Sequence, residues 1–184
     1  MGGLTGAFMH ASQRSGVRSP ARIGSALAAY PGLMTNRPRD RDADGRAHQS
    51  RPRDALGRPL PYGSTGVEPI SEDPLPPLQT VDVARGLLAA GRPFSAHEVF
   101  EARWKAGPAA ERDLWQGLAQ ICVALTHAAR GNEAGAQRLL DRGVGRLATY
   151  ASRGGPAYGL DLVRVIDRAE DAVRDPQCGG NPIS

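Results

Sequence analysis

The sequence of 184 residues has little cysteine, almost no lysine and few aromatic residues. Its two cysteines lack the spacing of a metal site and do not suggest a disulfide framework, which fits a reducing compartment. No apolar run approaches the roughly 18 residues that a membrane span needs, so we expect a cytoplasmic protein without a membrane partner. One lysine stands beside 22 arginines. GC-rich codons explain this bias, so the net charge of +4 is a poor sign of nucleic-acid binding.

A strand-like alternation of apolar and polar residues is also absent, and most of the prolines lie before residue 80. Prolines at that density interrupt any helical periodicity. We therefore expect residues 1–79 to form an irregular or disordered N-terminal arm. Residues 1–33 could lie upstream of the true start of translation, which would then be Met34.

From residue 80 the sequence has the apolar spacing of amphipathic helices. Gly91 and Gly131 follow apolar stretches and are natural helix ends. Ser95 and Asn132 can cap the helices that follow them, and Pro108 suits the first position of another. Connections of a few residues favour antiparallel neighbours. The sequence thus predicts an all-α fold, a compact bundle of about five antiparallel helices over residues 80–175, with a tail over residues 176–184.

The second predicted helix carries the most informative group of residues. One arc of roughly 100° on it holds two titratable and two aromatic side chains: His97, Phe100, Glu101 and Trp104. Because a face with Phe and Trp normally turns inward, the His97–Glu101 pair should be desolvated, and desolvated titratable groups are candidates for function. Glu98 lies on a different face, where it completes a capping box with the N-cap serine. The plainer alternative is that His97 and Glu101 only hydrogen-bond to each other.

The third predicted helix is apolar around most of its circumference, which predicts a central position in the bundle. One narrow polar stripe interrupts that surface: Gln116, Gln120 and His127. A central helix offers little surface to water, so we expect this stripe to meet the face of His97 and Glu101 in a buried polar cluster between two helices. If the stripe instead faces solvent, no such cluster forms.

Such a cluster has two possible uses. His97, Glu101 and His127 could hold a divalent metal ion, because side chains at i and i+4 can share an ion. The metalloprotease pattern fails, since position 101 is Glu where that pattern needs a second His. Alternatively, the polar groups satisfy one another and set the register of the helices without any turnover.

Three arginines at i, i+4 and i+8 form a stripe on the fourth predicted helix: Arg138, Arg142 and Arg146. A solvated helix face is the usual meaning of such a stripe, and recognition of nucleic acid or an acidic partner is the alternative. Residues 80–184 carry 13 basic and 12 acidic side chains, and no aromatic residues lie between the arginines. Binding of nucleic acid is therefore not favoured.

Three motifs carry a resemblance to a known family: His97-Glu98-x-x-Glu101-x-x-Trp104, Leu114-Trp115-Gln116-Gly117-Leu118-Ala119-Gln120, and His127-x-x-x-Gly131-Asn132. Over roughly residues 83–150 the chain resembles the bacterial family called domain of unknown function 309. Residues 51–61 are similar to an arm that precedes this domain in actinobacterial members. The resemblance implies a small all-helical domain and carries over no catalytic role. It implies a candidate polar site at His97, Glu98, Glu101, Trp104, Gln116, Gly117, Gln120 and His127.

We therefore expect a non-enzymatic module that binds a small ligand or a protein partner near the His/Glu/Gln cluster. One alternative is a metal-dependent or acid–base hydrolase that uses His97 and Glu101. Another is a nucleic-acid-binding protein. No residue is assigned a catalytic role, and a divalent metal is the only cofactor that the residues suggest.

Overall fold

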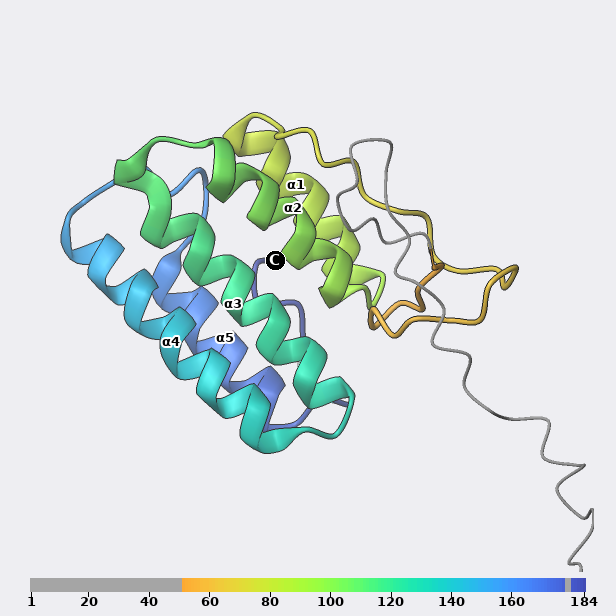
Figure 1. Cartoon of the computed structure of the whole chain (residues 1–184). Coiled ribbons are helices and arrows are strands. Elements are labelled where there is room, and N and C mark those ends of the chain that lie inside the picture. Colours follow the sequence, from red (N-terminus) through yellow and green to blue (C-terminus); the bar gives the residue numbers. More distant parts are fainter. Residues whose placement is uncertain (1–50, 178–179) are drawn as a thin grey trace, which may run out of the picture. The chain divides into compact units, whose positions relative to one another are not determined.

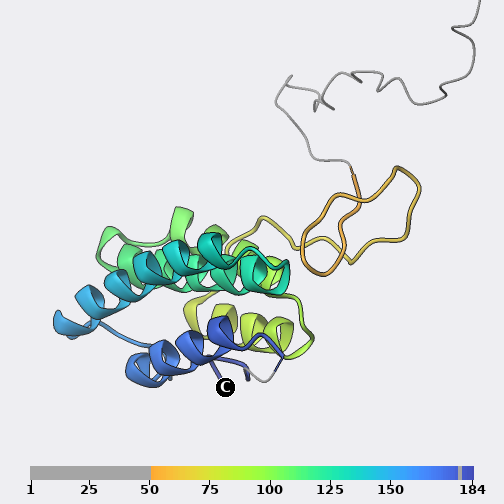
Figure 2. The ribbon, with the colours of Figure 1, turned by 90° about the horizontal axis from the view of Figure 1, so that it is seen from below.

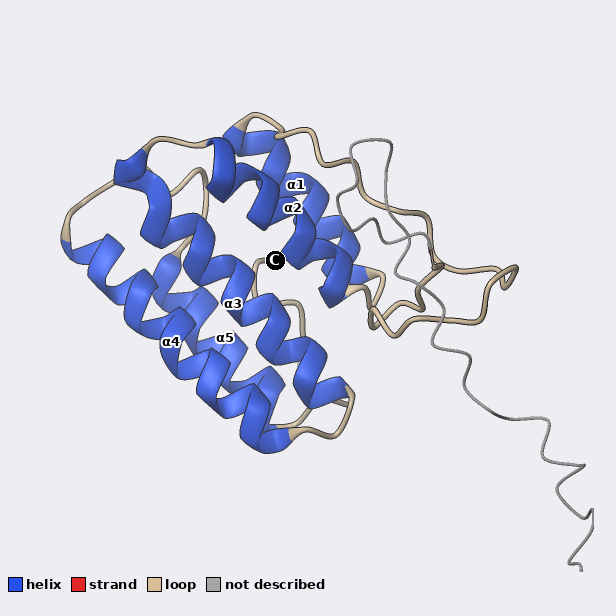
Figure 3. Cartoon of the chain, in the orientation of Figure 1, coloured by secondary structure: helices blue, strands red, loops and turns tan. Residues whose placement is uncertain are grey.

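Five α-helices and one short 3-10 helix make up the regular structure of the computed structural model, which describes residues 51–177 and 180–184 (Figure 3). These residues belong to one unit, residues 48–184. The helices are α1 (Pro77–Ala89), α2 (Pro93–Ala106), η1 (Ala109–Glu111), α3 (Arg112–Ala129), α4 (Glu133–Ser152) and α5 (Leu162–Arg174). The described residues contain no strand, so the predicted all-α bundle is confirmed. The expected start at Met34 lies outside the described residues.

Helix α3 occupies the centre of the bundle (Figure 1). It packs against α2 on one side and α4 on the other, while α1 and α5 form a second layer behind them (Figures 1 and 2). The side chains that fill the core from α3 are fully buried: Leu114, Trp115, Leu118, Ile121 and Cys122. The wide apolar surface of α3 thus explains its position, because only a central helix can bury so much of its circumference. No helix in the described part is long and apolar enough to cross a membrane.

Two glycines allow α3 and α4 to approach closely. A Cβ atom on Gly117 would lie 2.9 Å from Leu147 Cδ2, and one on Gly143 would lie 3.0 Å from the Gly117 carbonyl oxygen. The helices therefore cross at a point where both lack side chains.

The predicted helix ends at Gly91, Gly131 and Asn132 are confirmed. Gly91 and Gly131 have φ values of +67° and +76°, which a glycine adopts after a helix without strain. The Asn132 side chain accepts a hydrogen bond of 2.9 Å from the Gly135 amide and so caps α4.

The capping box predicted at Ser95 and Glu98 is wrong. Helix α2 begins three residues earlier than predicted, at Pro93, because proline lacks the amide hydrogen that the first helical position leaves unsatisfied. Ser95 is buried inside the first turn, where its hydroxyl accepts a hydrogen bond from the guanidinium group of Arg92. Glu98 is therefore available for another role. Pro108 likewise precedes η1, and α3 starts only at Arg112.

Residues 51–76 form an irregular arm that nevertheless packs on the bundle. Within the arm, the Leu60 amide donates to the Pro52 carbonyl at 2.8 Å, and the Val67 amide donates to the Arg53 carbonyl at 2.8 Å. Two bundle arginines hold it from outside: Arg92 donates to the Glu68 carbonyl at 2.7 Å, and Arg130 donates to the Leu56 carbonyl.

The last described residues, 180–184, also pack on the bundle. Ile183 is buried, and its carbonyl accepts a hydrogen bond of 2.8 Å from the Arg85 side chain on α1. The Asn181 amide group donates to the Arg85 carbonyl at 2.9 Å. The segment is thus fixed to α1 by both backbone and side-chain contacts.

Candidate binding site

His97 and Glu101 interact within α2 and lie at its partly exposed face. The Nδ1 atom of His97 is 2.7 Å from the Phe94 carbonyl oxygen, and Nε2 is 3.4 Å from Glu101 Oε2. Glu101 also pairs with Lys105 at 3.1 Å. The side chains of His97 and Glu101 are 19% and 34% exposed, so this pair is neither fully desolvated nor without partners.

Glu98 has the opposite character. It is half-buried, and it makes no hydrogen bond or ion pair with any residue in the described part of the chain. Burial raises the pKa of its carboxyl group, and the positive charges of His97 and Arg53 offset only part of that effect. A partly desolvated carboxylate without a hydrogen-bond or ion-pair partner raises the free energy of the folded state. Glu98, which the sequence assigns to capping, is therefore the acidic group of α2 with unused binding capacity.

A cleft of about 760 Å³ separates the arm from the start of α2. Its apolar lining comes from Pro52, Val67, Pro69, Ile70 and Phe94, and its carboxylates come from Glu68, Glu72 and Glu98. Next to the cleft the arm touches α2 at Gly57, where a Cβ atom would lie only 2.2 Å from the Phe94 ring.

A second cleft of about 380 Å³ lies on the other side of Glu98. It shares Ile70, Glu72 and Glu98 with the first cleft and continues past Glu101 towards Lys105. We call the two clefts together the Glu98 groove, since Glu98 lies where they meet. The groove follows the outer face of α2 and arm residues 66–74.

The arginines of the Glu98 groove are already engaged by the arm itself. Arg53 donates to the Gly57 carbonyl and its guanidinium lies 4.9 Å from the centre of the Phe94 ring. Arg51 donates to the Leu60 carbonyl at 3.0 Å. The side chains of Glu68, Glu72 and Glu98, by contrast, have no partner among the described residues. The groove therefore offers carboxylates with unused hydrogen-bonding capacity on an apolar surface, beside the charges of Arg51 and Arg53.

The polar stripe of α3 does not bond to the His97–Glu101 pair. His127 Nδ1 lies 2.8 Å from the Asn132 amide nitrogen, so it interacts with the cap of α4. Gln120 Oε1 is buried without a hydrogen-bond partner in the described part, and Gln116 makes no hydrogen bond there. Trp104 packs against the hydrophobic core.

The expected metal ligands are separated in the same way. His97 and Glu101 lie together on α2, whereas the ring of His127 is turned towards α4. Residues 51–177 and 180–184 contain no group of three or more His, Cys, Asp or Glu side chains placed to hold a metal ion.

The arginine stripe of α4 is divided between two environments. Arg146 is partly buried and pairs with Asp113 of α3 at 2.9 Å, and Arg153 pairs with the same carboxylate at 2.9 Å. Arg138 and Arg142 are exposed. Part of the stripe thus joins α4 to α3 rather than facing a partner.

A buried charged cluster surrounds Glu111, which the sequence did not single out. The carboxylate is 12% exposed and accepts hydrogen bonds from Arg103 at 3.1 Å, from Trp115 at 2.7 Å and from Tyr158. Burial tends to raise the pKa of Glu111, but these three hydrogen bonds outweigh it and the pKa is lowered. The bond to Glu111 also raises the pKa of Tyr158 to about 12. The only sequence signal was the spacing of Glu111 and Trp115 by one helical turn.

Comparison with known proteins finds a likeness to one family over part of the helical region. The sequence model of the family described as domain of unknown function 309 matches residues 81–139. The uncharacterized protein YpuF of Bacillus subtilis (strain 168) is 37% identical over 75 residues, which cover 40% of this chain and 42% of that relative. No solved structure matches the chain. Over residues 81–139, from α1 into α4, the chain is therefore similar to the family described as domain of unknown function 309, and it spans less than half the length of the relative that it matches.

Proposed function

We propose that this protein is a non-enzymatic module that docks an extended segment of a partner protein in the Glu98 groove, with a Lys or Arg side chain against Glu98. The observation that carries the proposal is the state of Glu98, a half-buried carboxylate with no hydrogen bond or ion pair among the described residues. A cationic group would supply the missing partner, and such charge-assisted hydrogen bonds are the stronger ones.

The shape of the groove supports a peptide as the occupant. Two clefts that share three residues form an elongated site, and an extended chain fits such a site better than a compact ligand does. Ile70 and Phe94 offer apolar contacts for the flanking side chains of the segment. Arg92 fixes the far wall, because it holds the Glu68 carbonyl at 2.7 Å.

The arrangement of His97 supports binding rather than hydrolysis. Both ring nitrogens face protein oxygens, those of Phe94 and Glu101. A general base needs a ring nitrogen within reach of the substrate proton. His97 is therefore better placed to position Glu101 than to act on a substrate.

The test uses three peptides, acetyl-Ala-Val-X-Val-Ala-amide with X as Lys, norleucine or Glu, titrated into the full chain and followed by NMR chemical shifts. We expect the Lys peptide to shift signals of residues in the Glu98 groove and to bind more tightly than the other two. Glu98→Gln should weaken its binding about tenfold, since one charge-assisted hydrogen bond contributes on the order of 1.5 kcal/mol.

Asp167→Asn is the matched control, because it removes one exposed carboxylate from α5 and leaves the Glu98 groove intact. It should leave the affinity for the Lys peptide unchanged. Equal binding of the Lys and norleucine peptides, or an unaltered affinity in Glu98→Gln, would contradict the proposal.

A further inference from the structure

The arm contributes main chain as well as side chains to the Glu98 groove. Residues 66–70 all line the groove, and this stretch contains neither helix nor turn. Pro69 favours an extended conformation of Glu68, because the residue before a proline is driven out of the helical region. Proline also lacks the amide hydrogen that an inner strand of a sheet needs, so it suits an outer edge. We call residues 66–70 the arm edge.

One side of the arm edge is bonded to the rest of the arm. Arg53 forms an isolated antiparallel bridge with Pro59. Beside that bridge the Asp54 amide donates to the Arg58 carbonyl at 3.0 Å. The Arg53 carbonyl therefore points to the opposite side, where it accepts a hydrogen bond of 2.8 Å from the Val67 amide. The arm edge is thus the outermost of three neighbouring segments.

The other side of the arm edge faces α2. In an extended chain the amide and carbonyl of one residue point to one side, and those of the next residue point to the other. Since Val67 bonds towards Arg53, the main-chain groups of Glu68 point away from the arm. Arg92, directly before α2, indeed donates to the Glu68 carbonyl at 2.7 Å. By the same alternation, the amide and carbonyl of Ile70 point towards α2.

Most of these main-chain groups have no partner. The amides of Glu68 and Ile70 and the carbonyl of Ile70 make no hydrogen bond within residues 51–177 and 180–184. A row of unpaired amides and carbonyls along an outer edge is a template for pairing with another chain. The Glu98 groove lies directly against this edge.

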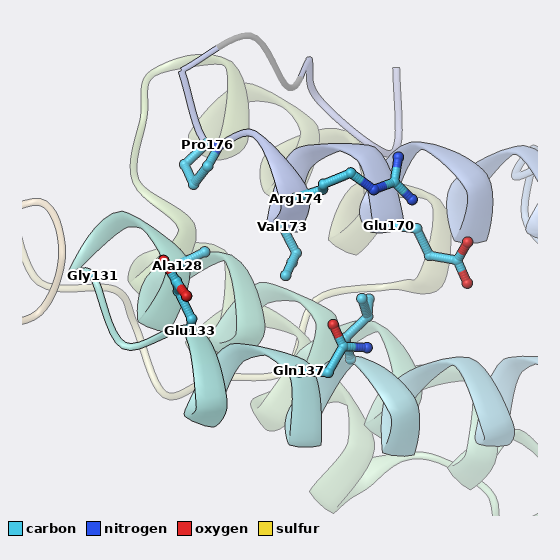
Figure 4. Close-up of a pocket in the computed structure, with 9 residues that line it drawn as sticks. Ala128, Gly131, Glu133, Gln137, Glu170, Val173, Arg174 and Pro176 are labelled. Carbon is cyan, nitrogen blue, oxygen red and sulfur yellow. The ribbon is translucent and has the colours of Figure 1, made fainter.

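The cleft between α4 and α5 offers no such edge. It has a volume of about 560 Å³, and its two walls come from helical residues such as Gln137 and Glu170 (Figure 4). Because the amides and carbonyls of a helix bond to each other along the same chain, these walls present side chains. The α4–α5 cleft therefore serves as an internal control for binding through the main chain.

We propose that the partner segment adds to the arm edge as a β-strand, an inference that rests on the function proposed above. Its main chain pairs with the amides of Glu68 and Ile70 and with the Ile70 carbonyl, while its cationic side chain reaches Glu98. Main-chain bonds of this kind supply affinity, and pockets for alternate side chains supply specificity. The partner is thus a segment that can extend, with β-branched residues beside the Lys or Arg, and not a helix.

The first test places a single N-methyl group on the main chain of the peptide acetyl-Ala-Val-Lys-Val-Ala-amide, at the first valine, the lysine or the second valine. Each methyl group removes one amide hydrogen and leaves the side chain unchanged. Alternate amides of a strand point to opposite sides. We therefore expect the lysine position and the two valine positions to differ in NMR titrations of the full chain. One class should lose at least tenfold in affinity and the other less than twofold.

The second test measures amide hydrogen exchange in the full chain by NMR, with and without saturating unmethylated peptide. Exchange at Glu68 and Ile70 should slow at least tenfold, because their amides become bonded. Exchange at Ser71, whose amide points away from α2 by the same alternation, should change less than twofold. Signals of the α4–α5 cleft should not shift.

Equal losses of affinity for all three methylated peptides would overturn the strand addition, as would unchanged exchange at Glu68 and Ile70 in the peptide complex. In either case a peptide that still depends on Glu98 would leave the function proposed above intact, so the two proposals can fail separately. An unmethylated peptide that does not bind, or that shifts only signals of the α4–α5 cleft, would overturn both.

Discussion

The indole nitrogen of Trp115 donates a hydrogen bond of 2.7 Å to Glu111, which lies one helical turn earlier. The same carboxylate accepts hydrogen bonds from Arg103 of α2 and from Tyr158 in the segment between α4 and α5. Trp115 in turn stacks on the Tyr158 ring, at 5.4 Å between ring centres. Tyr158 has a backbone φ of +52°, a value that residues other than glycine rarely adopt. One buried carboxylate thus joins three segments at this end of the bundle.

Glu111 should make the protein sensitive to acid. Its pKa is lowered in the folded state, so its contribution to stability is fully present above the ordinary value of 4.5 and is lost as the pH falls through the folded pKa. We expect Glu111→Gln to lower the free energy of unfolding at pH 7 by about 1–3 kcal/mol, since its partner Trp115 is buried and Arg103 and Tyr158 are partly buried. Urea unfolding of the wild type and of Glu111→Gln between pH 3 and pH 7 measures the loss of stability in acid and the effect of the substitution at pH 7.

Asp171→Asn serves as the control for Glu111→Gln, because the Asp171–Arg174 pair is exposed and contributes little. The free energy of unfolding of Asp171→Asn should fall in acid as steeply as that of the wild type. If the Glu111→Gln variant lost stability in acid as steeply as the wild type does, Glu111 would not be the responsible group.

Glu98 should have the opposite effect on stability. Burial raises its pKa, so the folded state favours the protonated form, and the charged form destabilises the protein at neutral pH. We expect Glu98→Gln to raise the free energy of unfolding at pH 7 by about 0.5 kcal/mol, a small value because solvent screens a half-buried group. The gain should vanish below pH 4. Loss of stability in this variant would show instead that Glu98 has a stabilising partner.

The crossing of α3 and α4 should not tolerate a larger residue at Gly143. A Cβ atom there would lie 2.9 Å from Ile121 Cγ1 and 3.0 Å from the Gly117 carbonyl oxygen, and backbone cannot move easily. We expect Gly143→Ala to destabilise the protein by about 1–2 kcal/mol, despite the better helix propensity of alanine. Thermal unfolding monitored by circular dichroism gives the change.

Gly145 provides the matched control on the same helix. No atom lies within 4 Å of a Cβ placed there, so Gly145→Ala should stabilise the protein by up to about 1 kcal/mol. Equal effects of the two substitutions would rule out the close helix crossing as their cause.

The contact between Gly57 and Phe94 should decide whether the arm stays on α2. Gly57 has a φ of +76°, and a Cβ atom would meet the Phe94 ring at 2.2 Å. We expect Gly57→Ala to release the arm, so that trypsin cleaves after Arg53 at least fivefold faster. Arg51 and Arg58 precede prolines and are poor trypsin sites.

Gly63→Ala is the control that separates the strain of a positive φ from the clash of a Cβ atom with Phe94, since Gly57→Ala would cause both. Gly63 has a φ of +82° but nothing lies within 4 Å of its Cβ position. Cleavage after Arg53 should therefore stay close to the rate of the wild type in this variant. If both variants were cleaved equally fast, the Phe94 contact would not be what holds the arm.

Local sequence signals were enough to predict the all-α fold, the central place of α3 and the helix ends at Gly91, Gly131 and Asn132. These features depend on the period of apolar residues, the freedom of glycine at positive φ and the reach of an asparagine side chain to the next turn. Such properties act between neighbours in the chain, so they can be read without knowing the fold.

The partners of the polar side chains, by contrast, follow from the tertiary structure. The angular position of a residue on a helix gives its direction, but the partner in that direction depends on segments far away in the sequence. Glu111 therefore bonds to Tyr158, which lies 47 residues later, and Glu98 faces a groove whose other wall is the arm. That arm has no period to read, because proline and glycine remove the regular hydrogen bonds that would reveal its course.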